Sequence, residues 1–125
     1  MKINKKSTRS YQKLEDVVLL DKSWMLEKVL EKLDVLIYNG NMDLMVNTIG
    51  MNSVVHNLNW SGRDDFLKSG SKPYWVTLSE GSSRLAGYYG EGGRLTYLVI
   101  RNSGHMVPIS QPEVTGIVVK NFVHG

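Results

Sequence analysis

The sequence predicts an α/β fold in which a mixed sheet is flanked by helices. Two short aliphatic runs, Val35–Tyr38 and Leu98–Ile100, contain no charged or amide side chain, a pattern typical of strands that are buried on both faces. Turn residues close each run, and amphipathic helical patterns lie before the first run and after the second. A chain of 125 residues with 42% hydrophobic and 22% charged residues has the composition of one globular domain.

The first half of the chain predicts helix, strand and helix in turn. A helix from Asp21 to about Lys32 precedes the strand Val35–Tyr38, and a second helix runs from Val46 to about Leu58. The apolar positions expected to face inward are Leu26, Leu30 and Leu33 in the first helix, and Ile49, Val54, Val55 and Leu58 in the second.

The second half predicts strands followed by a final helix. Arg63–Lys72 has the composition of a polar surface loop, and Tyr74–Leu78 is a short strand pattern. Leu85–Tyr89 and Leu95–Ile100 are expected to form a hairpin through the glycines between them. Without a following helix and a Gly-Lys-Ser/Thr sequence, those glycines do not predict a phosphate site.

The final helix is expected to begin at Ser110. Ser110 and Glu113 have the spacing of a capping box, and Pro112 fits a first turn, where no intrahelical N–H is needed. Gly116 lies near the centre of this helix and should weaken it.

Two polar residues follow the two buried strands and are candidates for a catalytic pair. Asp43 lies three residues after Gly40, which closes the first strand, and His105 follows the turn residues 102–104 after the second. Open α/β sheets place reactive groups at the carboxyl ends of their strands. Aspartate before histidine is also the order of the last two members of a Ser-Asp-His triad in α/β-hydrolases. A loop histidine without a catalytic role is the alternative.

The segments around both residues carry motifs of a known family. Residues 38–43, Tyr-Asn-Gly-Asn-Met-Asp, and 104–108, Gly-His-Met-Val-Pro, followed by Gln111-Pro112, are similar to the aspartate and histidine segments of serine carboxypeptidases. The retinoid-inducible and vitellogenic-like branch is the most similar, and the resemblance extends from about Asp21 to Phe122. It implies the C-terminal portion of an α/β-hydrolase fold, incomplete on its own.

The resemblance implies a role for each candidate residue. His105 corresponds to the general base of a peptidase that releases C-terminal amino acids, and Asp43 to the carboxylate that orients it. Met106 corresponds to a residue that lines the pocket for the leaving amino acid, with a core methionine as the alternative. The family also implies peptide substrates and a secreted or lysosomal location, although the N-terminal residues of this sequence lack the apolar stretch expected of a signal peptide.

The nucleophile of such an enzyme is absent from the sequence. No Gly-x-Ser-x-Gly or close variant occurs, and the family's upstream Asn-Gly-Gly-Pro-Gly segment is missing too. We therefore expect the chain alone to be inactive as a peptidase. A catalytically inactive truncated fragment, a gene model cut short and a carboxypeptidase-like acyltransferase remain open as alternatives.

Composition argues against several other classes of protein. Of 15 Lys and Arg residues, five lie within residues 1–13, which contain no acid and are expected to be a disordered leader. Residues 14–125, the predicted domain, then hold 10 basic and 12 acidic residues, which does not favour nucleic-acid binding. No apolar run is long enough to span a membrane.

We expect no metal and no cofactor. The chain has no cysteine, and its three histidines, His56, His105 and His124, lack metal-ligand spacing. His56 falls on the predicted helix from Val46 to Leu58 and is interpreted as a surface residue.

The strand Val35–Tyr38 is expected to pair with Leu95–Ile100 on one side and to lack a partner within this chain on the other. An apolar strand with an unpaired edge and neither charge nor proline is prone to self-association.

Overall fold

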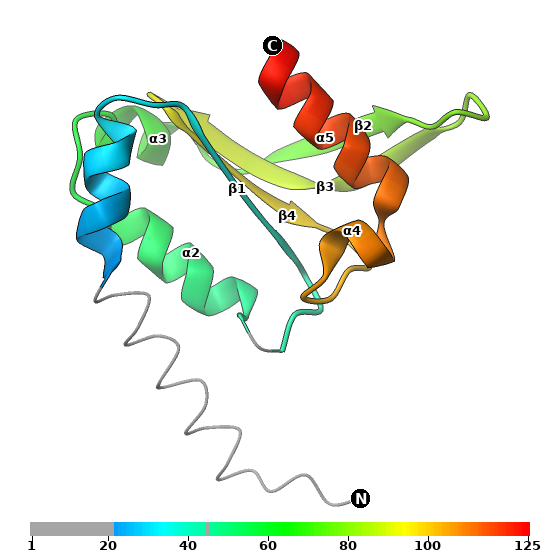
Figure 1. The fold of residues 1–125 in the computed structure, drawn as a ribbon, viewed down its shortest axis with the longest axis horizontal. Helices are drawn as coiled ribbons and strands as arrows, with labels where there is room; N and C mark the ends of the chain where they lie inside the picture. The colour runs from blue at the N-terminus through cyan, green and yellow to red at the C-terminus, as the bar shows by residue number, and fades with distance from the viewer. Residues whose placement is uncertain (1–21, 45) are drawn as a thin grey trace, which may run out of the picture.

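The fold is a four-stranded mixed sheet with helices on both faces (Figure 1). The computed structural model describes residues 22–44 and 46–125. The leader expected at residues 1–13 and the helix start expected at Asp21 therefore lie outside the described residues. A helix at residues 22–30 comes first. The elements that follow are β1 (Val35–Gly40), α2 (Thr48–Asn57), α3 (Arg63–Ser69), β2 (Lys72–Thr77), β3 (Ser83–Gly92), β4 (Leu95–Ile100), α4 (Val107–Ser110) and α5 (Pro112–His124).

The strand order is β1-β4-β3-β2, with one parallel and two antiparallel pairs. β1 and β4 run parallel in a register that aligns Val35 with Leu95 and Gly40 with Ile100. The predicted pairing of the two apolar strands is confirmed, as is the hairpin, in which β3 is longer than expected and turns at Gly93-Arg94. Because the pair is parallel, both strands end at the same edge of the sheet.

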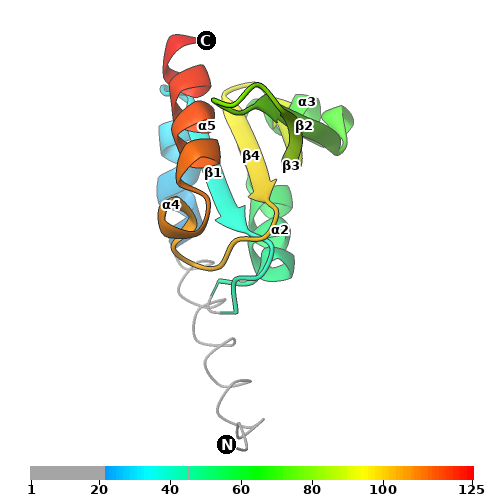
Figure 2. The same ribbon diagram turned by 90° about the vertical axis from the view of Figure 1, so that its right-hand side faces the viewer.

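Alternate side chains of β1 and β4 enter two separate hydrophobic cores. On one face, Leu95 and Tyr97 of β4 pack with buried residues of the 22–30 helix, α2 and α3. On the other face, Leu98 and Ile100 pack with Val107, Val114 and Val118 of α4 and α5. Figure 2 shows α2 and α5 on opposite sides of these strands. The two-sided burial explains why neither strand contains a charged side chain.

The prediction of a surface loop at Arg63–Lys72 is wrong, because α3 occupies most of this segment. Phe66 is buried in this helix and packs into the core beside Trp60 and Tyr97. Asp64 and Asp65 lie in the first turn, where carboxylates interact favourably with the helix dipole. Two adjacent apolar residues, Phe66 and Leu67, among polar neighbours give no clear helical period, so the pattern did not reveal this helix.

Two other helices differ from the expectation. The helix expected to begin at Ser110 begins at Pro112, and Ser110 ends α4 instead. The capping box does not form, because the Glu113 carboxylate accepts a hydrogen bond from the Ser79 N–H. The first helix ends at Leu30 rather than Lys32, which leaves Leu33 exposed, and Ile49 of α2 is 84% exposed rather than inward.

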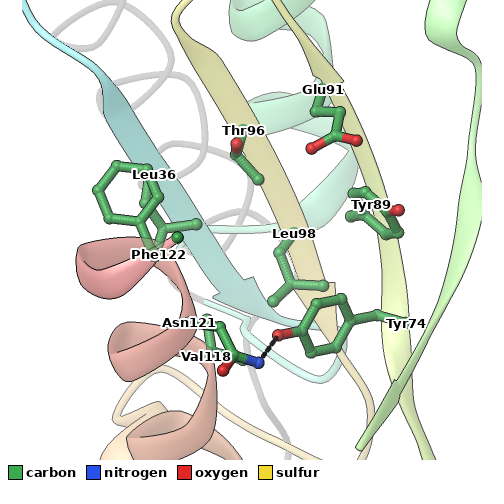
Figure 3. A pocket seen from close by; sticks show the side chains of 10 residues that line it. Leu36, Tyr74, Tyr89, Glu91, Thr96, Leu98, Val118, Asn121 and Phe122 are labelled. Atoms are coloured by element: carbon green, nitrogen blue, oxygen red, sulfur yellow. Dashed lines mark hydrogen bonds between the residues drawn. The ribbon is translucent and has the colours of Figure 1, made fainter.

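On the face of the sheet that α5 covers, a pocket of about 320 Å³ lies beside β1. Leu36 of β1 and Phe122 of α5 line one end, and Tyr74 and Tyr89 line the other (Figure 3). The Asn121 side chain donates a hydrogen bond to the Tyr74 hydroxyl at 3.1 Å across this space. The side chain of Leu36 is thus only partly covered.

The loops that follow β1 and β4 are in direct contact. The N–H of Asn41 donates to the Ile100 carbonyl at 2.9 Å, and the N–H of Met42 donates to the Ser103 carbonyl at 2.9 Å. A Cβ atom on Gly40 would overlap the carbonyl oxygens of Ser103 and Gly104. This close approach requires glycine at position 40.

Substitution of Gly40 by alanine should therefore separate the two loops. We expect Gly40→Ala to lower the free energy of unfolding by about 1–3 kcal/mol in urea titrations, the usual cost of inserting a methyl group into packed structure. Gly104→Ala is the matched control, since a Cβ there meets no atom within 4 Å. Equal stabilities of the two variants would contradict the tight contact.

The outer edge of β1 has no partner strand within the described residues. The N–H of Val35 bonds to Arg94 and that of Asn41 to Ile100, so the odd-numbered residues of β1 face β4. The N–H groups of Leu36 and Tyr38 consequently point away from the sheet, because alternate residues of a strand bond to opposite sides.

We expect the chain to self-associate through this edge. Hydrogen exchange of the Leu36 and Tyr38 amides should be fast in dilute solution and slow as protein concentration rises, while Ile37, bonded to β4, is protected throughout. Sedimentation velocity measures the association in parallel. A monomer at all concentrations, with Leu36 as protected as Ile37, would show that the edge is not used in this way.

Candidate functional site

Asp43 lies in the loop after β1, with its carboxylate inside the protein. The residue is 5% exposed, and its side chain is 3% exposed. The backbone N–H of Val46 donates a hydrogen bond to Oδ1 at 3.0 Å, and the N–H of Asp43 donates to the Gly40 carbonyl. A carboxylate that is removed from water needs such partners, because an uncompensated buried charge is strongly destabilising. The loop therefore holds Asp43 in one orientation.

His105 follows the turn after β4 and meets Asp43 across the two loops. Its Nδ1 atom lies 3.0 Å from Oδ2 of Asp43, although the residues are 62 positions apart in sequence. An ionised carboxylate only accepts hydrogen bonds, so Nδ1 carries the proton. When the ring is neutral, Nε2 is then its basic atom. The side chain is 48% exposed. The buried aspartate orients an imidazole that remains accessible.

The other sequence candidates lie apart from this hydrogen bond. Met106 follows His105 directly and occupies the N-cap position of α4. Its side chain is largely exposed, which contradicts a core role. His56 is on the surface of α2, where its Nδ1 lies 2.7 Å from the Asn52 carbonyl oxygen and its ring packs against Phe66. The structure thus brings Asp43 and His105 together and leaves His56 outside.

Two buried polar residues near the pair were not singled out from the sequence. Asn39 at the end of β1 is 6% exposed, and its Oδ1 accepts a hydrogen bond from the Tyr97 hydroxyl at 3.1 Å. Burial raises the pKa of Tyr97 to about 12. The signal in the sequence is a lone amide at the end of an apolar strand, a pattern that also suits the first residue of a turn.

The Asp43–His105 pair has the geometry of a general base and its orienting carboxylate, and no metal site accompanies it in the described residues. Within residues 22–44 and 46–125, no group of three or more His, Asp or Glu side chains could hold a metal ion. An imidazole hydrogen-bonded to a carboxylate can accept a proton at Nε2 and stabilise the resulting positive charge. Such a pair activates a hydroxyl nucleophile when one lies within hydrogen-bond reach.

No helix in the described part of the chain is long and apolar enough to cross a membrane.

Known proteins similar to this chain are serine carboxypeptidases. A pheromone-processing carboxypeptidase of Phytophthora infestans is 36% identical over 117 residues, which cover 93% of this chain and 19% of the relative. Serine carboxypeptidase 3 of Oryza sativa is 38% identical over 93 residues, covering 74% of this chain and 18% of the relative. A probable serine carboxypeptidase of Homo sapiens is 30% identical, covering 89% of this chain and 23% of the relative. The chain thus spans about a fifth of the length of these relatives, which do not single out one branch.

Comparison with solved structures points to the same family. A crystal structure of a prohormone-processing carboxypeptidase from Saccharomyces cerevisiae superposes with a TM-score of 0.69 at 25% identity, over 82% of this chain and 22% of that one. The mixed sheet and its helices thus match part of the α/β-hydrolase fold of serine carboxypeptidases. The sequence profile of the family described as serine carboxypeptidase matches residues 1–125. The chain belongs to the serine carboxypeptidase family.

Proposed function

We propose that this chain supplies the aspartate and histidine of a serine carboxypeptidase active site. The observation that carries the proposal is the 3.0 Å contact between Nδ1 of His105 and Oδ2 of the buried Asp43. Family membership supports the reaction class, the release of C-terminal amino acids from peptides. The nucleophilic serine belongs to a part of such an enzyme that these 125 residues do not contain.

His105 acts as general base and then as general acid in this proposal. Its Nε2 accepts the proton of the serine hydroxyl as the serine oxygen attacks the scissile carbonyl carbon, and then gives that proton to the leaving amine. A water molecule is activated in the same way to release the acyl group. Asp43 keeps the proton on Nδ1 and stabilises the imidazolium that forms in each step.

Met106 is the candidate for substrate contact, because its exposed side chain adjoins His105 in sequence at the edge where the site lies. In the complete enzyme it lines the pocket for the leaving residue. By family resemblance, the substrates are peptides and the enzyme is secreted or lysosomal.

The chain by itself should not form an acyl-enzyme. A base without its nucleophile leaves no serine activated for attack, so a fluorophosphonate probe should not label the purified 125-residue chain. Mass spectrometry of the intact protein measures the covalent adduct. Stoichiometric labelling, together with turnover of a blocked dipeptide, would disprove the assignment of a missing nucleophile.

A chimera tests the proposed roles in a complete active site. This chain replaces the matching C-terminal segment of the Phytophthora infestans relative, and release of a C-terminal amino acid is measured. We expect His105→Ala to lower kcat by several orders of magnitude with little effect on folding. Asp43→Asn should cost about 10⁴-fold, the effect of the equivalent change in a chymotrypsin-like protease, because it selects the wrong imidazole tautomer.

His56→Ala is the matched control in the same chimera, since it removes an imidazole that lies outside the site. Its kcat should stay within about twofold of the unsubstituted chimera, as is usual for a surface change away from the chemistry. A folded chimera without activity would refute the proposal. A large loss of kcat for His56→Ala, with activity retained in His105→Ala, would show that His105 is not the general base.

A further inference from the structure

Asn39 and Tyr97 form a buried polar pair beneath the loop that carries Asp43. Asn39 is 6% and Tyr97 5% exposed, and the two belong to the neighbouring strands β1 and β4. Their side chains meet at 3.1 Å within a core that is otherwise apolar around Tyr97. Burying two polar groups there is unfavourable unless both find partners, so this pair calls for an explanation beyond packing.

The donors and acceptors of this pair can be arranged in only one way. The Asn39 side chain contacts the Val46 carbonyl oxygen at 3.5 Å, and a carbonyl can only accept a hydrogen bond. The Nδ2 group of Asn39 therefore faces Val46, and Oδ1 faces Tyr97. The Tyr97 hydroxyl must then donate, which requires the neutral phenol. The raised pKa of Tyr97 keeps the phenol neutral across the physiological range.

The network continues from Val46 to the catalytic carboxylate. Asn39 bonds to the carbonyl of Val46, and the N–H of the same residue donates to Oδ1 of Asp43 at 3.0 Å. At 3.5 Å the Asn39–Val46 contact is at the long end of the range for a hydrogen bond. Tyr97 fixes the amide of Asn39, the amide holds Val46, and Val46 orients the carboxylate that faces His105.

We infer that Asn39 and Tyr97 are positioning residues, which act through Val46 to aim Asp43 at Nδ1 of His105. The inference rests on the proposed roles of Asp43 and His105. It gives the two buried side chains a part in selecting the His105 tautomer without any contact to substrate. A role in core stability alone is the rival explanation.

Nitrogen NMR of the His105 ring distinguishes the two explanations in the 125-residue chain. The chain with its own sequence should show the proton on Nδ1, and Asp43→Asn should shift both ring nitrogen resonances toward the other tautomer. Tyr97→Phe, which removes only the hydroxyl, should produce a partial shift in the same direction. Asn39→Leu, which removes the link to Val46, should produce a larger one.

Tyr74→Phe is the matched control for loss of a tyrosine hydroxyl. The Tyr74 hydroxyl accepts a hydrogen bond from Asn121 in the pocket on the α5 face (Figure 3), whereas Tyr97 packs into the core on the opposite face of the sheet. This variant should leave the His105 resonances unchanged, even if its melting temperature falls as far as that of Tyr97→Phe.

The double variant Asn39→Leu/Tyr97→Phe separates positioning from stability. Replacing both partners of a buried hydrogen bond by apolar groups leaves neither of them unsatisfied, so the melting temperature should recover relative to the single variants. The altered His105 tautomer should nevertheless persist. If the tautomer recovers with the melting temperature, the pair has only a structural role and the inference is overturned.

Failure of this inference differs from failure of the proposed function. If Asp43→Asn changes the His105 resonances while Tyr97→Phe and Asn39→Leu do not, the inference fails and the catalytic pair stands. If the chain with its own sequence shows no Nδ1 proton held by Asp43, both fail. An inactive chimera with the tautomer shifts as expected refutes the proposed function alone.

Discussion

Hydrogen bonds between β1 and β4 hold two parallel strands in register, and every feature of the candidate site follows from where those strands end. Because the strands run in the same direction, the loops after Gly40 and Ile100 leave the sheet at one edge. Direct backbone hydrogen bonds from Asn41 and Met42 then join the loops. Two residues that are 62 positions apart thereby come within hydrogen-bond distance. An antiparallel pair would place the same loops at opposite edges.

The burial of Asp43 gives the pair its chemical character. A carboxylate in water is mobile and hydrated, whereas that of Asp43 is surrounded by protein and bonded at both oxygens. The imidazole of His105 is half exposed and so remains open to a reacting group. One partner is rigid and enclosed, and the other is accessible, which is the division of roles that a general base and its orienting group require.

The two faces of the sheet differ in polarity near the site. On the face covered by α2 and α3, Asn39 and Tyr97 place polar groups inside the core, directly below the loop of Asp43. The face covered by α5 is apolar and has a pocket beside Leu36. The outer edge of β1 also lacks a partner among the described residues. A second pocket, of about 300 Å³, lies on the face covered by α2 and α3, where His56, Phe66 and Tyr97 are among the residues that line it.

Elements with a strong repeating pattern were predictable from the sequence, and those that depend on a single contact were not. The apolar runs of β1 and β4 predicted two buried strands, their pairing and the Asp43–His105 candidates at their ends. α3 was missed because its only buried side chain is Phe66, whose partners lie elsewhere in the chain. The start of α5 was misplaced because Glu113 bonds to Ser79 rather than to the start of its own helix. Local capping rules cannot foresee a partner that is 34 residues away.

The sequence by itself determined which residue types were available for chemistry, their order along the chain and the strands that they follow. These properties are local, since periodicity and turn residues are encoded in short segments. Only the tertiary structure decided the protonated nitrogen of His105, the need for glycine at position 40 and the link from Tyr97 through Asn39 to the Asp43 loop. Each of these depends on distances between segments that are far apart in sequence, and such distances exist only once β1 and β4 have paired.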